Sequence, residues 1–122
     1  MPWSEKAFAD LLTHDYCHYL VAEKDGEPVG FAGMTVSCGE GEIDKVMVAP
    51  SCQRQGIADA LLTALFELGK EIGVTAYTLE VRVSNEPAIR LYEKHGFRSE
   101  GVRPRFYEKP TEDALIMWKR EE

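Results

Sequence analysis

The sequence predicts a mixed α/β fold, in which one sheet carries helices on its faces. Two observations lead to this prediction. Over residues 56–72 the apolar residues keep the spacing of a long amphipathic helix, and over residues 77–83 they alternate with polar ones, as in a strand with one buried face. Short extended runs separated by glycine- or proline-containing turns lie on both sides of these segments. The expected order of elements is α-β-β-β-α-β-α-β-β.

The first half of the chain is expected to begin with a short helix, capped by Ser4 and running to about Thr13. Three strands then follow, at about residues 19–22, 29–36 and 43–48. The first two are joined by a tight turn at residues 25–28 and form a hairpin. Ala49 and Pro50 end the third strand.

The most strongly predicted helix covers about residues 56–72, and Gly73 ends it. Its buried stripe is expected to consist of Leu61, Leu62, Leu65, Leu68 and Ile72. This stripe requires a sheet to pack against, which the strands before and after it supply.

The strand at residues 77–83 is expected to bury Tyr77, Leu79, Val81 and Val83 on one face. The opposite face carries Glu80. A second helix is expected to begin after Asn85, a favourable N-cap, with Pro87 in its first turn, and to stop at Gly96. Two further extended segments, at about residues 97–107 and 114–118, complete the chain.

Length and charge limit the kinds of protein that this sequence can encode. The 122 residues fit one domain, residues 1–122, and 14 basic against 21 acidic residues give a formal net charge of −7. A field of that sign disfavours nucleic acid and anionic membranes as partners. The three cysteines and three histidines show neither disulfide nor metal-ligand spacing. No apolar run is long enough to span a bilayer and no signal segment is seen, so we expect a cytoplasmic protein.

A strand, a short polar loop and a glycine directly precede the long helix. Free N–H groups and the positive end of the dipole make a helix start attractive to anions. Gly56 and Ala58 are small, so that a phosphate could approach the backbone, and Arg54 adds a cation. The pattern indicates a phosphate site, although the same pattern also occurs as an ordinary loop before a helix. It lacks the GK[ST] of a P-loop.

Glu80 on the polar face of its strand and Tyr92 on the following helix could converge on one cleft. A carboxylate and a phenol suit a base and an acid at opposite ends of a group transfer. The residues alone leave open that Glu80 is merely solvated and that Tyr92 packs against the sheet. Cys52, beside the phosphate loop, offers a nucleophilic thiol as a competing reading. No histidine is near it in sequence, which favours a structural cysteine.

Two motifs together resemble those of the GNAT acetyltransferases, and most of all the RimI-type branch. They are Pro-x-x-Gln-x-x-Gly-x-Ala from Pro50 and Leu-Glu-Val-Arg-x-x-Asn-x-x-Ala-x-x-Leu-Tyr-x-x-x-Gly-Phe from Leu79. Residues 2–5 and 106–114 also resemble that branch, whose members acetylate the N-terminal alanine of a ribosomal protein. The resemblance implies the three-layer acyl-CoA N-acyltransferase fold. The family's first strand and helix have no counterpart before Trp3.

The resemblance also implies acetyl-CoA as co-substrate, without a metal, and a role for each matching residue. Glu80 matches the general base and Tyr92 the general acid, while Trp3 and Tyr107 match acceptor-side residues. Asp59 stands where a basic or neutral residue is usual, and we expect its carboxylate to point away from the pyrophosphate. The positions that match acetyl-CoA contacts are Val46, Met47, Val48, Arg54, Gln55, Gly56, Ile57, Ala58, Asp59 and Asn85.

The expected acceptor is the N-terminal α-amine of a ribosomal protein. An α-amine titrates near ~7.8 and a lysine near ~10.4, so a single carboxylate is better matched to the former. The alternatives are a small-molecule amine acetyltransferase and a CoA-binding module without catalysis. Because the family's first strand is missing, residues 19–21 are expected near an open sheet edge. A partner chain in a homodimer, or Trp3 and the first helix, would cover that edge.

Overall fold

The computed structural model describes residues 7–14, 16–53 and 56–121. Its strands are β1 (Ala7–His14), β2 (Cys17–Lys24), β3 (Glu27–Ser37), β4 (Glu40–Val48), β5 (Ala76–Arg82), β6 (Arg98–Tyr107) and β7 (Glu112–Arg120). Its helices are α1 (Ile57–Glu71) and α2 (Glu86–Lys94), with a 3-10 turn at Pro50–Cys52.

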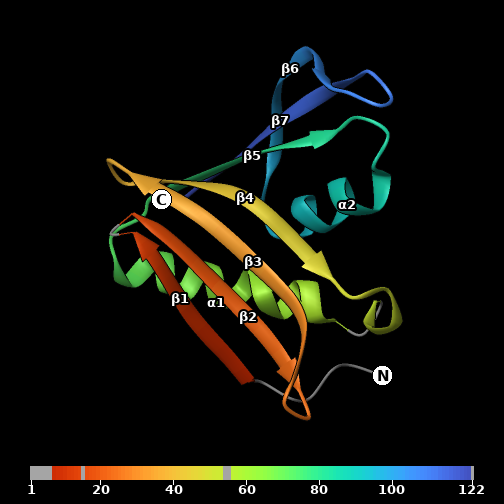
Figure 1. The fold of residues 1–122 in the computed structure, drawn as a ribbon. Helices are drawn as coiled ribbons and strands as arrows, with labels where there is room; N and C mark the ends of the chain where they lie inside the picture. The colour runs from red at the N-terminus through yellow and green to blue at the C-terminus, as the bar shows by residue number, and fades with distance from the viewer. Residues whose placement is uncertain (1–6, 15, 54–55, 122) are drawn as a thin grey trace.

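The strands that the structure describes form one seven-stranded sheet in the order β1-β2-β3-β4-β5-β7-β6 (Figure 1). Neighbouring strands are antiparallel, except that β4 and β5 are parallel. The long helix α1 connects these two parallel strands, as a parallel crossover requires. The predicted mixed α/β class is confirmed.

The first element was predicted wrongly. Residues 7–14 form strand β1 rather than the expected helix, and Ser4 lies outside the described residues. β1 pairs with β2 from Ala7 opposite Glu23 to His14 opposite Cys17. A helix of this length is marginal by itself, so pairing with a neighbouring strand decides its conformation. Residues 19–21 are consequently not at an open edge, because β1 lies outside them.

Helix α1 packs its apolar stripe against β2, β3 and β4. Its buried residues are Ile57, Leu61, Leu62, Leu65 and Gly69, which meet Leu20, Ala22, Ala32 and Met34 in the core. The predicted stripe is correct for its first three leucines. Leu68 is only partly buried and Ile72 is 43% exposed, because the ring of Tyr77 packs at Gly69 and fills the space beneath the last turn.

Strand β5 alternates as predicted, with Tyr77, Leu79 and Val81 at 1%, 3% and 6% exposure. Val83 was expected to follow them into the core but is 41% exposed. The strand ends one residue earlier, and the N–H of Val83 donates to the carbonyl of Asp113 at 3.2 Å. The chain then enters α2 with Asn85 as its cap, as predicted, since Asn85 Oδ1 accepts from the N–H of Ala88 at 3.3 Å.

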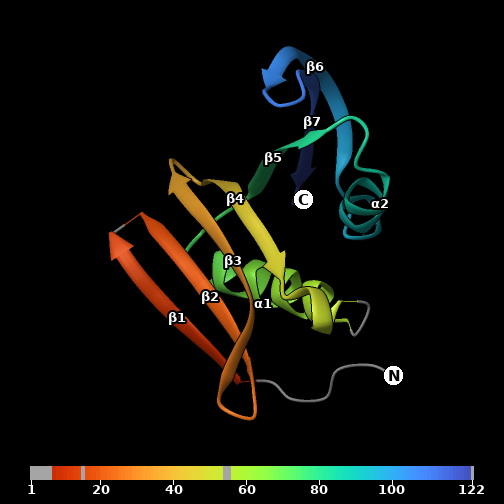
Figure 2. The same ribbon diagram turned by 45° about the vertical axis from the view of Figure 1, so that its right-hand side comes forward.

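The parallel strands β4 and β5 separate soon after they meet. Among the described residues they pair only where residues 40–42 of β4 lie opposite residues 76–78 of β5. The β3–β4 register also shifts where Gly33 pairs with Lys45 and Met34 with Ile43, which leaves Asp44 as an extra residue in β4. Figure 2 shows the two strands diverging, with α2 beside the wider end. The second half of β4 therefore has one edge without a strand partner.

Candidate active site

Two adjoining hollows occupy the space between the diverging strands. Both are lined by Val46, Asn85, Ala88 and Tyr92, so they form one continuous cleft. The first, of about 430 Å³, reaches the start of α1, and the second, of about 530 Å³, reaches the strand face of β5. The cleft thus joins the predicted phosphate loop to the predicted base.

The start of α1 has the features of an anion site. Gly56 precedes the helix at φ +80°, a left-handed conformation that favours glycine, and no side chain caps the helix. The N–H groups of the first turn therefore lack a side-chain acceptor at the end of the first hollow. Ile57 is 1% exposed, so its contribution there is its backbone alone. Arg54 and Gln55 lie outside the described residues.

Asp59 lines the first hollow, but its charge is engaged by the end of α2. Its Oδ1 lies 2.9 Å from His95 Nε2 and 3.1 Å from Lys94 Nζ. Burial acts to raise the pKa of Asp59, yet the hydrogen bonds and charges of His95 and Lys94 outweigh burial and lower that pKa. The two partners were not predicted. The sequence signal that could have indicated these partners is the presence of basic residues near the end of the second helix.

The unpaired edge of β4 runs along the cleft. Val46 and Val48 line it and pack partly against the core, while Met47 is 54% exposed. Gln53, from the loop, donates from its side-chain Nε2 to the carbonyl of Val48 at 3.3 Å. This bond ties the phosphate loop to the end of β4.

The second hollow is lined by Glu80, Tyr92 and Tyr107, and also by Met47 and Asn85. Three separate elements, β5, α2 and the end of β6, position them. Burial, with a smaller contribution from Tyr107, raises the pKa of Tyr92, so its hydroxyl is protonated at neutral pH. Burial and then the Glu80 carboxylate raise the pKa of Tyr107, against an opposing effect of Arg82. Trp3, the other predicted acceptor-side residue, lies outside the described residues.

The side chain of Glu80 is only 18% exposed. Its Oε2 is buried and accepts no hydrogen bond, although Nε of Arg103 lies 3.0 Å away at ion-pair distance. A buried acceptor without a hydrogen bond is costly and marks a position where a donor would be bound favourably. Arg103 was not predicted as a partner of Glu80, because it is on β6, two strands away from β5 in the sheet.

Cys52 also lines the first hollow, where it is half-buried and packs against the core. Its Sγ lies 3.7 Å from the hydroxyl of Ser51. Within residues 7–14, 16–53 and 56–121, no cluster of three or more His, Cys, Asp or Glu side chains could hold a metal ion. No helix in the described part of the chain has the length and hydropathy of a membrane span.

One cleft thus combines a helix start without a side-chain cap, a free strand edge and a carboxylate–phenol pair, the arrangement expected of an acyl-CoA-dependent acetyltransferase. The chain belongs to the acetyltransferase (GNAT) family, whose sequence model matches residues 1–97. It is accordingly an N-acetyltransferase that uses acetyl-CoA, as the motifs predicted.

Relatives narrow the branch of this family. The ribosomal protein bS18-alanine N-acetyltransferase of Escherichia coli (strain K12) is 39% identical over 120 residues, which cover 95% of this chain and 79% of that protein. The N-alpha-acetyltransferase RimI of Mycobacterium tuberculosis is 35% identical, with coverages of 95% and 74%. The crystal structure of the Escherichia coli ribosomal-protein-S18-alanine enzyme matches with a TM-score of 0.84 and 34% identity, covering 88% of this chain and 71% of that one. The RimI-type resemblance and the fold are confirmed.

Proposed function

We propose that this enzyme transfers the acetyl group of acetyl-CoA to the α-amine of an N-terminal alanine on a ribosomal protein. The observation that carries the proposal is the shared cleft, in which Glu80 and Tyr92 lie beside the unpaired edge of β4. The names of the relatives from Escherichia coli and Mycobacterium tuberculosis support the class of acceptor.

Acetyl-CoA supplies an acetyl group activated as a thioester. The first-turn N–H groups of α1, over residues 57–59, would hold its pyrophosphate, together with Arg54 and Gln55 of the same loop. The edge of β4 from Val46 to Val48 would pair with the extended pantetheine arm. Because Asn85 Oδ1 already caps α2, its Nδ2 is the group that would donate to this arm.

On the acceptor side, Glu80 takes the proton from the attacking amine, directly or through one water. An entering amine supplies the hydrogen-bond donor that the buried Oε2 lacks. Arg103, whose side chain is 56% exposed, is the neighbour that must move aside. Tyr107, and Trp3 from the N-terminal segment, would contact the rest of the acceptor peptide.

Charge that develops during the transfer is met by two further groups. Backbone N–H groups near Met47 and Val48 would donate to the acetyl carbonyl oxygen. Tyr92 would give its hydroxyl proton to the departing sulfur and regain one from solvent. Its raised pKa keeps that proton available at neutral pH.

The acceptor assignment is tested with three amines. An alanine-initiated peptide, an N-terminally blocked peptide with an internal lysine, and a polyamine are compared by acetyl-CoA turnover. Deprotonation at pH 7 costs roughly 1 kcal/mol for an α-amine and roughly 4.6 kcal/mol for a lysine, so we expect the alanine peptide to have a kcat/KM more than about tenfold higher. The net charge of −7 also favours a basic peptide.

Each other result would contradict the proposal. Equal turnover of the blocked lysine peptide would refute α-amine selection. A preference for the polyamine would indicate a small-molecule acetyltransferase. Tight acetyl-CoA binding without turnover of any amine would indicate a CoA-binding module.

Glu80→Gln tests the base. We expect kcat with the alanine peptide to fall by about a hundredfold below pH 7, where the amine is protonated, and to recover partly above pH 8.5, where the amine is already neutral. Glu86→Gln, in an exposed pair with Arg90, is the control and should keep the wild-type pH profile. A wild-type profile for Glu80→Gln would remove this residue from the mechanism.

A ribosomal-protein acceptor supports a cytoplasmic location for this enzyme. A homodimer, if formed, would use the outer edge of β1, which is the terminal strand on that side of the described sheet. Sedimentation equilibrium at micromolar concentration would show it as twice the chain mass.

A further inference from the structure

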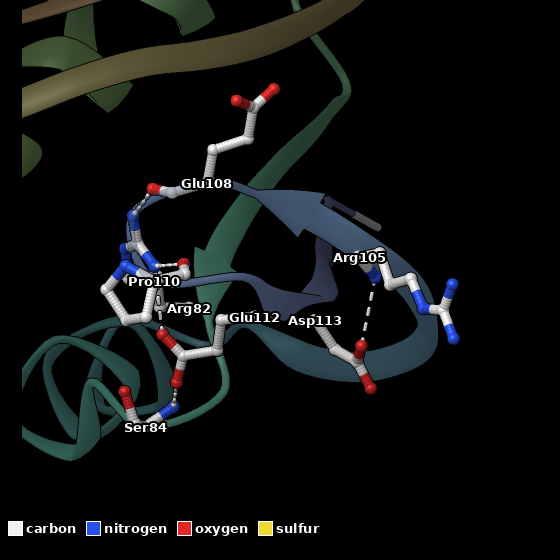
Figure 3. A network of polar contacts seen from close by, with 7 residues as sticks. All are labelled: Arg82, Ser84, Arg105, Glu108, Pro110, Glu112 and Asp113. Atoms are coloured by element: carbon white, nitrogen blue, oxygen red, sulfur yellow. Dashed lines mark hydrogen bonds and ion pairs between the residues drawn. The ribbon is translucent and has the colours of Figure 1, made fainter.

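Arg82 at the end of β5 holds the connection between β6 and β7. Its Nη1 donates to the carbonyl of Pro110 at 3.0 Å and to Glu112 Oε1 at 3.1 Å, and its Nη2 donates to the carbonyl of Glu108 at 3.0 Å (Figure 3). The guanidinium carbon also lies 4.5 Å from the centre of the Tyr107 ring. One planar side chain therefore contacts four residues between 107 and 112.

Glu112 completes the attachment from the other side. Its Oε2 accepts the backbone N–H of Ser84 at 3.0 Å, in the link between β5 and α2. The hydrogen bonds from Ser84 and then from Arg82 lower the pKa of Glu112. Figure 3 shows Glu112 between these two donors. The turn end of the hairpin is thus joined both to the strand that carries Glu80 and to the link that leads into the helix that carries Tyr92.

Polar contacts matter here because β6 has little packing of its own. No residue of β6 is buried, and most are exposed. Arg82 is two residues from Glu80 on the same face of β5, and Tyr107 lines the cleft beside that carboxylate. The position of Tyr107 relative to Glu80 therefore depends on what Arg82 holds.

We propose that Arg82 is a positioning residue for the acceptor: it fixes the β6–β7 connection and Tyr107 beside Glu80, and so sets acceptor binding without contributing to acetyl-CoA binding. The inference rests on the proposed function in taking Glu80 and Tyr107 as the acceptor side. Arg82 lines the second hollow, opposite the edge of β4, whereas the start of α1 lines the first hollow, which Arg82 does not line.

Arg82→Lys tests the proposal because it keeps the charge but cannot reach three acceptors with one planar fork. We expect the KM of the alanine peptide to rise roughly tenfold, the equivalent of one lost charge-assisted hydrogen bond, and the KM of acetyl-CoA to change less than about twofold. Glu112→Gln should raise the acceptor KM by a smaller factor. Arg90→Lys, in the exposed pair with Glu86, is the control and should leave both constants unchanged.

Amide hydrogen exchange provides a readout that needs no acceptor. In Arg82→Lys we expect faster exchange over residues 104–112 and unchanged exchange over α1. Equal rises in both KM values, or unchanged exchange over residues 104–112, would overturn the proposal. If the wild-type enzyme does not turn over the alanine peptide, the proposed function fails. The KM comparison is then made with whichever amine is acetylated, and the exchange result still decides the role of Arg82.

Discussion

The two sides of the cleft are built in different ways. The α1 side is packed: Leu61, Leu62 and Leu65 are fully buried and hold the helix start in place from below. The β6–β7 side has in β6 a strand without buried residues, which pairs with β7 and is further held by the side-chain contacts of Arg82 with Glu112 and of Arg103 with Glu80. A change in one polar group leaves apolar packing intact. The same change can remove a contact that depends on that group.

This difference bears on what each side binds. The α1 side is suited to the invariant part of the reaction, the CoA pyrophosphate, because a helix start is useful only if it is rigidly placed. The hairpin side is the proposed acceptor side, and the residues of β6, none of which is buried, can be altered without disturbing the core. Acceptor preference is therefore expected to change through substitutions in the hairpin.

The largest expected effect is a loss of stability caused by a substitution in the packed core beneath α1. Leu62→Ala should lower the free energy of unfolding by about 2–5 kcal/mol, because it leaves a cavity between α1 and the sheet. Val102→Ala on β6, where the side chain is 51% exposed, should change it by less than about 0.5 kcal/mol. Urea denaturation measures both. Equal losses would show that the hairpin is packed as firmly as α1.

A second change acts where the two sides meet. Tyr92→Phe removes the hydroxyl proposed to protonate the leaving sulfur but keeps the ring against Phe97, at 5.8 Å between centroids. We expect kcat to fall about a hundredfold, while acetyl-CoA affinity by calorimetry stays within about twofold. An unchanged kcat would exclude Tyr92 as the acid.

A third change affects only the phosphate end. Gly56→Val places a β-branched residue at φ +80° and fills the helix start, so acetyl-CoA affinity should weaken about tenfold or more in calorimetric titration. Gly26→Val, at the same φ in the open turn between β2 and β3, carries a similar backbone strain away from the cleft. It should bind acetyl-CoA normally. Normal binding by the folded Gly56→Val protein would contradict the assignment of the loop.

The smallest expected effect concerns the link between α1 and α2. Because the pKa of Asp59 is lowered in the folded protein, its contribution to stability is present above its ordinary value of 3.8 and is lost as the pH falls through the folded value. Asp59 is 36% exposed, so solvent screens its pairs with Lys94 and His95. Asp59→Asn should cost less than about 1 kcal/mol at pH 7.

Urea denaturation at pH 7 and pH 3 checks this prediction. The gap between wild type and Asp59→Asn should narrow at the lower pH, because below 3.8 the unfolded wild-type chain gains a proton on this carboxyl that the folded protein binds less readily. A gap that widens on acidification would mean that the carboxylate is destabilising in the folded protein.

The sequence by itself determined the elements whose signal is local. The leucine spacing of α1, the alternation in β5 and the Asn85 cap are each specified within a few residues. The two motifs also placed Glu80 and Tyr92 together, and the structure has both in one cleft. Their chemical roles stay predictions.

Only the tertiary structure decided the elements and contacts that depend on distant residues. Residues 7–14 are a strand because β2 is available to pair with them, and the end of the α1 stripe depends on Tyr77 from β5. The partners of Asp59, 35 and 36 residues away, and those of Arg82, 26 to 30 residues away, meet only when the sheet forms. A local pattern specifies a conformation through neighbouring residues. Contacts between residues distant in the sequence require the intervening chain to form a closed loop, and a local pattern therefore does not predict them.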